Sequence, residues 1–171
     1  MRTARDLSRL ALLVALGILL PLFFHLTNIP GKVFLPMHLP VLLAGFLLGP
    51  VAGLVVGLVS PLVNFVLSGM PPLSPPILPV MVIELSVYGL VAGAGVRARR
   101  VEHLFLVLAL AMLAGRLAMG LAIWLVGPAF GWPFQPYPYV AGAVVTGLPG
   151  IVIQFVVIPP IVRAIRRLWG L

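Results

Sequence analysis

The sequence lacks cysteine and is poor in acidic residues, with only three in 171 positions. Without cysteine the chain has no disulfide bonds, thiolate nucleophiles or thiolate metal sites, and its redox compartment stays open. The three acidic residues form no catalytic pair, and a P-loop, an HExxH motif and a GxSxG elbow are all missing. His25, His38 and Glu84 match no metal-ligand spacing. We therefore expect no enzymatic activity, no cofactor and no metal site.

What is present is apolar: 62% of residues are hydrophobic, 8% are charged and the mean hydropathy is +1.23. Because a surface of this composition is unsuited to water, we expect an all-α integral membrane protein. A spanning helix needs roughly 20 apolar residues. We therefore expect residues 1–171 to form a single domain of six transmembrane helices. The expected spans are Leu7–Leu26, Leu35–Leu48, Val51–Leu67, Ile77–Val96, Leu104–Val126 and Tyr139–Ile165. The second is short and contains Pro36 and Pro40, so an irregular start is expected.

The basic residues give the orientation. They form three clusters: Arg2, Arg5 and Arg9; Arg97, Arg99 and Arg100; Arg163, Arg166 and Arg167. With six spans, all three clusters fall on one side, which the positive-inside rule makes cytoplasmic, together with both termini. The same placement beside anionic lipid explains the net charge of +8 without a nucleic-acid partner.

The opposite side carries three segments rich in proline, glycine and aromatic residues, at 27–34, 68–76 and 127–138. Lys32 is their only full charge. Four aromatic residues in or beside the last segment form either an interfacial belt or a lid over an external pocket. The residues concerned are Trp124, Trp132, Tyr137 and Tyr139.

Two ionisable residues, Glu84 and Arg116, fall inside the expected spans at a similar depth, about 10 to 15 Å from the outer helix ends. A buried charge is costly, so each needs a partner or a wet cavity. They form either a structural ion pair or part of a pocket in which Arg116 binds a substrate carboxylate. His38, Asn64 and Tyr88 add hydrogen-bonding groups in the same outer half.

Small residues four apart recur along the chain, a spacing that lets helices approach closely. The pairs are Ala11/Ala15, Gly45/Gly49, Gly53/Gly57 and Gly89/Gly93. The spacing alone favours packing within the bundle over binding of a partner.

Three segments carry a family resemblance: LPMHLPVLLAGFLLGP (35–50), GLVVGLVSPLVNFVLSGMPPL (53–73) and IELSVYGLVAG (83–93). They resemble the S components of energy-coupling factor (ECF) vitamin transporters, most of all the pantothenate-type subgroup. The resemblance covers the first four spans; the last two agree only in general character. It implies a six-helix fold in a prokaryotic cell membrane, with both termini in the cytoplasm.

The resemblance also implies partners and a site. Ala11 and Ala15, in the phrase ALLVA, match the element that docks the transmembrane T component, which works with two ATPase subunits. The vitamin would bind in the outer half of the bundle. The residues that fall in matching segments there are His38, Asn64, Met70, Glu84 and Tyr88, and Arg116 joins them by depth and charge.

The leading hypothesis is therefore a high-affinity vitamin-binding subunit with no chemistry of its own. Pantothenate is the first candidate substrate, because its carboxylate suits Arg116 and its hydroxyl and amide groups suit His38, Asn64 and Glu84. Two alternatives stay open: a stand-alone transporter that uses Glu84 for proton coupling, and a small membrane enzyme or assembly factor, which no motif supports.

Overall fold

The computed structural model describes residues 4–73, 77–99, 103–128, 131 and 135–169, and these ranges contain only helices and their connections. The helices are α1 (Ala4–Leu26), α2 (Gly31–Phe34), α3 (His38–Leu48), α4 (Pro50–Ser68), α5 (Ile77–Arg99), α6 (Leu104–Val126) and α7 (Pro136–Trp169). Six segments are long and apolar enough to cross a membrane, α2 and α3 together forming one of them. This confirms the expected all-α fold with six spans. Arg2, Arg100, Glu102 and Trp132 lie outside the described residues.

The second span starts irregularly, as expected. α2 is one turn long and ends before Leu35, whose backbone is left-handed with φ of 53°. The following Pro36 disfavours helical geometry at the residue before it. α3 then restarts at His38 and tolerates Pro40 in its first turn, where a backbone N–H has no helical partner in any case.

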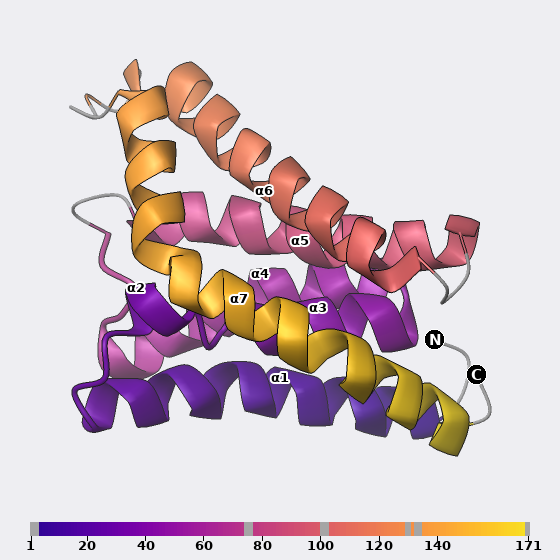
Figure 1. Cartoon of the computed structure of the whole chain (residues 1–171). Coiled ribbons are helices and arrows are strands. Elements are labelled where there is room, and N and C mark those ends of the chain that lie inside the picture. The colour runs from indigo at the N-terminus through magenta and orange to yellow at the C-terminus, as the bar shows by residue number, and fades with distance from the viewer. Residues whose placement is uncertain (1–3, 74–76, 100–102, 129–130, 132–134, 170–171) are drawn as a thin grey trace.

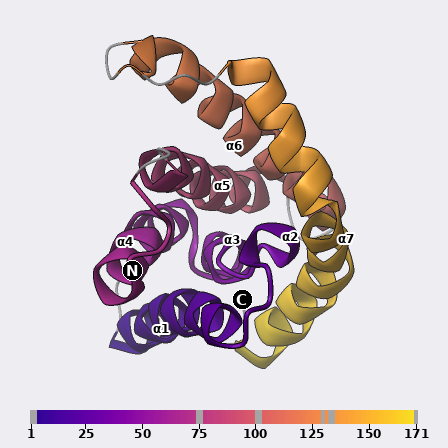
Figure 2. The ribbon, with the colours of Figure 1, turned by 90° about the vertical axis from the view of Figure 1, so that its left-hand side faces the viewer.

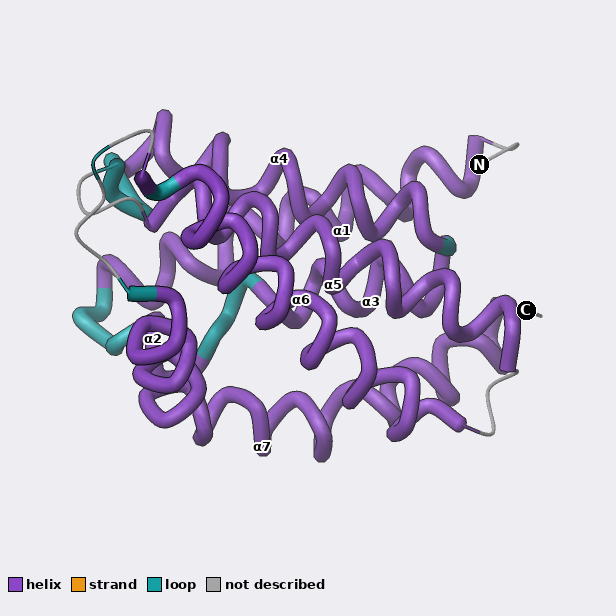
Figure 3. Tube along the Cα trace, turned by 90° about the horizontal axis from the view of Figure 1, so that it is seen from above, coloured by secondary structure: helices purple, strands orange, loops and turns teal. Residues whose placement is uncertain are grey.

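The helices run side by side, with most connecting loops at the two ends of the bundle (Figure 3). α3 lies near the centre and is almost wholly buried, with α1, α4, α5 and α7 around it (Figure 2). α1 begins and α7 ends at the same end of the bundle (Figure 1), which fits an even number of spans. We call this the basic end, marked by Arg9, Arg97 and Arg166, and the opposite end the loop end, marked by Asn28 and Ser68. That the basic end faces the cytoplasm stays a prediction from the charge pattern.

Glycines bring α3, α4 and α5 into backbone contact. A Cβ added at Gly53 would collide with the backbone of Gly89, and one added at Gly57 would lie 2.5 Å from the carbonyl oxygen of Leu85. At the end of α3, a Cβ on Gly45 would lie 2.5 Å from the Gly89 carbonyl oxygen. The glycine pairs of these three helices therefore serve packing inside the bundle, the role that their spacing favours.

α7 is the longest helix, and it exceeds the expected Tyr139–Ile165 at both ends. Its 34 residues span about 51 Å, well beyond the roughly 30 Å of a bilayer core. It bends between its steep first part and its diagonal second part (Figure 1), and the prolines inside it, Pro149, Pro159 and Pro160, remove helical hydrogen bonds. Next to Pro149, Gly150 packs closely on the carbonyl of Phe34, so the bent helix covers α2.

Candidate functional site

Four of the residues named from the sequence meet in one buried cluster between α3, α5 and α6. The carboxylate oxygen Oε1 of Glu84 accepts hydrogen bonds from the Tyr88 hydroxyl and from Nη1 of Arg116, both at 2.8 Å. Nε2 of His38 lies 3.8 Å from the same oxygen, and its ring is 5.2 Å from that of Tyr88. All four side chains are buried, so Glu84 is the shared acceptor of a polar cluster inside an apolar bundle.

The local sequence explains this geometry. Glu84 and Tyr88 are one helical turn apart on α5, so they share a face. Gly115 precedes Arg116 on α6, and a side chain there would collide with the Tyr88 ring. On α7, a Cβ at Gly147 would lie 3.1 Å from Cδ1 of Leu35 and in ordinary contact, at 3.6 Å, with Nη2 of Arg116. Gly115 thus makes space on α6 for the Tyr88 ring of the cluster.

The cluster fixes three helices to one another, as the ion-pair interpretation of Glu84 and Arg116 expects. Breaking such a pair by removing one partner leaves an uncompensated buried charge, which costs about 3 to 5 kcal/mol. Not every donor is used, however. Among the described residues, Nε and Nη2 of Arg116 and both ring nitrogens of His38 are buried without a hydrogen-bond partner. The cluster therefore keeps spare hydrogen-bonding capacity.

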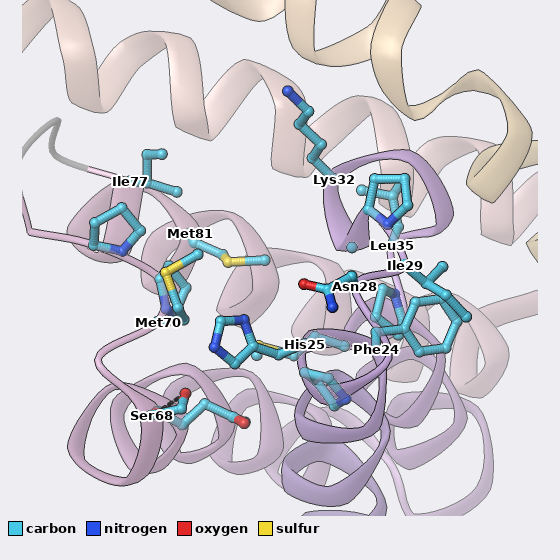
Figure 4. Close-up of a pocket in the computed structure, with 18 residues that line it drawn as sticks. Phe24, His25, Asn28, Ile29, Lys32, Leu35, Ser68, Met70, Ile77 and Met81 are labelled. Atoms are coloured by element: carbon cyan, nitrogen blue, oxygen red, sulfur yellow. Dashed lines mark hydrogen bonds between the residues drawn. The ribbon is translucent and has the colours of Figure 1, made fainter.

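A cavity of about 460 Å³ opens at the loop end, between the end of α1, α2, the end of α4 and the start of α5. Its wall is mostly apolar, and its polar members are His25, Asn28, Lys32, Asn64 and Ser68. Figure 4 shows Asn28 and His25 between Met70 and Met81 on one side and Phe24 and Leu35 on the other. Apolar walls with a few polar groups, at this volume, are typical of a small-molecule site.

Asn64 both lines this cavity and holds the bundle together. Its amide nitrogen donates to the carbonyl oxygen of Gly17 on α1 at 3.0 Å and to that of Ser60 at 2.9 Å. Gly17 is itself in close contact with Ser60, so α1 lies tightly against α4 at this level. The cavity wall is therefore anchored on both helices.

The six residues named from the sequence thus fall into two groups. Asn64 and Met70 line the cavity, and His38, Glu84, Tyr88 and Arg116 form the buried cluster beside it. The two groups are adjacent, because the cavity-lining Met37 precedes His38 and the cavity-lining Met81 lies one turn before Glu84. The aromatic side chains of Trp124 and Tyr137 are exposed and do not line the cavity, which fits an interfacial belt.

Sequence reasoning missed four cavity residues: His25, Asn28, Lys32 and Ser68. A usable signal existed, because all four lie at or near the two external segments 27–34 and 68–76. Lys32 stands out among them as the only full charge in those segments. Among the described residues, no aspartate or glutamate lines the cavity. The positive charge of Lys32 therefore has no acidic counterpart in the cavity wall.

One comparison with known proteins gives a match. The family described as ECF transporter, substrate-specific component, matches residues 5–162, which is nearly the whole chain. No curated protein and no solved structure matches the chain.

Proposed function

The chain belongs to the family of ECF transporter substrate-specific components, and from this premise we propose that it binds a small carboxylated vitamin, pantothenate first among the candidates, in the cavity at the loop end. Members of this family are membrane-embedded transporter subunits and not enzymes. They work with a transmembrane T component and ATPase subunits. The substrate, its position and the docking surface are the parts proposed here.

The observation that carries the proposal is the cavity itself. It is open at the loop end, its volume of about 460 Å³ suits a small ligand, and its apolar wall would cover the ligand's carbon skeleton. Asn28, Asn64 and Ser68 offer hydrogen bonds to hydroxyl and amide groups. Pantothenate combines such groups with a carboxylate and an apolar branched carbon, so its chemistry fits this wall.

We assign the ligand carboxylate to Lys32 in place of Arg116. Nη1 of Arg116 is already bonded to Glu84, and Arg116 does not line the cavity. Lys32 does line it, and no carboxylate of the described residues pairs with it. The cluster of His38, Glu84, Tyr88 and Arg116 would then form a fixed support beside the cavity, with its spare donors available to a ligand that reaches deeper.

Calorimetric titration of the purified chain with a panel of vitamins tests the proposal. Pantothenate should bind saturably, and its uncharged alcohol analogue, pantothenol, should bind more weakly. Because a hydrogen bond to a charged group contributes about 1.5 to 3 kcal/mol, the difference should be roughly 10-fold to 100-fold. If folded protein binds no member of the panel, the cavity is not a vitamin site.

Variants identify the group that receives the carboxylate. In Lys32→Gln, pantothenate and pantothenol should bind with similar affinity, whereas Arg5→Gln, an exposed arginine at the basic end, should keep the wild-type preference. A preference that survives in Lys32→Gln but disappears in folded Arg116→Gln would return the carboxylate to Arg116.

The stand-alone transporter is less favoured. A proton-coupling carboxylate must alternate between charged and neutral forms, whereas Glu84 is held as the acceptor of two 2.8 Å hydrogen bonds, one from a guanidinium. We expect vesicles that contain this chain alone to show no uptake under a proton gradient. Uptake abolished by Glu84→Gln would overturn this view.

For the partner surface we propose α1. Ala11 is exposed and Ala15 is half-buried, so the outer face of α1 presents small residues to its surroundings. Leu7, Leu12 and Leu19 on the same helix are more than half exposed. An apolar helix face with small residues suits close packing of another membrane helix, such as one from the T component.

A further inference from the structure

A second cavity lies at the basic end, remote from the proposed vitamin site. Its volume is about 480 Å³, and it lies at the ends of three helices. Its wall is formed by residues 45–48 of α3 with the following Gly49, by Gly93, Val96 and Arg97 of α5, and by Arg166 of α7. Its two charged members are both arginines. The wall also contains backbone of the last turn of α3.

Each arginine has donors to offer. Nη1 of Arg166 donates to the carbonyl oxygen of Phe46 at 3.1 Å, which fixes the side chain, while its Nε is buried without a partner among the described residues. The guanidinium of Arg97 lies over Gly49, where a Cβ would be 3.0 Å from Nη2. The missing side chain of Gly49 therefore leaves the Arg97 guanidinium room beside the cavity.

The described part of the chain has no carboxylate left for these arginines. Asp6 lies 3.7 Å from Arg9, and Glu84 is paired with Arg116 in the middle of the bundle. Arg97 and Arg166 form no ion pair with any described residue. Two guanidinium groups at one cavity make a local excess of positive charge that attracts an anion.

We propose that this cavity binds the phosphate of an anionic phospholipid headgroup. Guanidinium groups bind phosphate oxygens through paired hydrogen bonds, and basic pockets between spanning helices at the cytoplasmic side are suited to such headgroups. The location supports a lipid, because the cavity lies at the ends of membrane-spanning helices, where headgroups are concentrated. The site is independent of the vitamin cavity, which lies at the opposite end.

Binding of short-chain phosphatidylglycerol to the purified full chain, measured by native mass spectrometry against phosphatidylcholine, tests this site. Phosphatidylglycerol should bind more tightly. Each basic side chain near a headgroup contributes about 1 kcal/mol, so Arg97→Gln should weaken it about fivefold and the double variant with Arg166→Gln about 25-fold. The control Arg167→Gln, an exposed arginine at the same end that does not line the cavity, should stay within about twofold.

Three results would overturn the proposal. The first is unchanged phosphatidylglycerol binding in Arg97→Gln. The exposed Arg97 side chain makes no hydrogen bond or ion pair with a described residue, so this change should leave folding intact. The second is inorganic phosphate binding as tightly as the lipid with the same dependence on both arginines, which would assign the cavity to free phosphate. The third is a double variant, Arg97→Gln with Arg166→Gln, that binds lipid as tightly as the wild type but no longer associates with the T component. This result would assign the arginines to a partner's carboxylates.

Discussion

Small residues four apart occur both on α1 and where α4 meets α5, yet the structure places them in opposite surroundings. Gly53, Gly57 and Gly89 are buried, and their missing side chains let two backbones touch. Ala11 on α1 faces outwards. The same spacing therefore builds the interior in one region and leaves a free surface in the other.

The difference shows what a small-residue pair requires to become a buried interface. In a membrane no hydrophobic force drives two helices together, since lipid tails are as apolar as side chains. The packing of α4 against α5 therefore depends on backbone contact, which glycine on both helices allows. α1 instead turns Gly17 towards Ser60 and the amide of Asn64, and its alanines remain on the other face.

The largest effect is expected where both helices supply glycine. A side chain at Gly89 would overlap the backbone of Gly53, so Gly89→Leu should force α4 and α5 apart and cost more than about 3 kcal/mol. We expect loss of folded protein in detergent, measured by size-exclusion chromatography and thermal unfolding. Gly142→Leu is the control, because nothing lies within 4 Å of a Cβ there. Folded Gly89→Leu with wild-type stability would mean that the two helices are not in backbone contact.

On the outer face of α1, added bulk should leave folding intact and instead impair transport. Ala11→Phe adds bulk at an exposed position, so folding and vitamin binding should be unchanged while ATP-driven uptake with the T component and ATPases is lost. Reconstituted vesicles that contain the full transporter give the uptake, and calorimetry gives the binding. Leu113→Phe, which changes an exposed position on α6, should keep uptake. If uptake is equal in the two variants, Ala11 does not belong to the docking surface.

Part of the fold could be predicted from the sequence. The number and approximate limits of the spans were predictable, because apolar runs and basic clusters follow directly from the bilayer. α5 begins at Ile77 and α6 covers Leu104–Val126, as expected. The sequence predicts a start of α7 that is too late, at Tyr139, because Pro136 and Pro138 suggest a loop. In the structure Pro136 occupies the first residue of the helix, where proline is well accepted.

The site was predictable only in part. The shared depth of Glu84 and Arg116 left two interpretations open, an ion pair or a substrate pocket, and the structure places Nη1 of Arg116 2.8 Å from Oε1 of Glu84. Depth could not reveal that Lys32 would line a cavity, because that depends on the turn at Leu35 and on the way α2 folds over the bundle. Whether any of these residues contacts a substrate stays a prediction.

A smaller loss of stability is expected when the contact between α4 and the inner face of α1 is weakened. Asn64→Ala removes two hydrogen bonds, to the carbonyl oxygens of Gly17 and Ser60, and should lower the free energy of unfolding by about 1 to 3 kcal/mol. Thermal unfolding in detergent measures the change. Ser68→Ala is the control at the same cavity, since Ser68 makes one local bond to the Asn64 carbonyl and its loss should cost less. Equal effects of the two substitutions would show that Asn64 does not tie α1 to α4.

The smallest change in stability is expected for glycine-to-alanine substitutions, and its direction should differ between two positions. Alanine is favoured over glycine inside a helix by about 0.5 to 1 kcal/mol, so Gly142→Ala, at an open position of α7, should stabilise the protein slightly. The same change at Gly53 should destabilise it, because the added methyl would meet the Gly89 backbone and neither helix can yield locally. Unfolding midpoints of the two variants therefore separate packing from intrinsic helix preference. Stabilisation in both variants would mean that helix preference, and not close backbone packing, governs the glycines of α4 and α5.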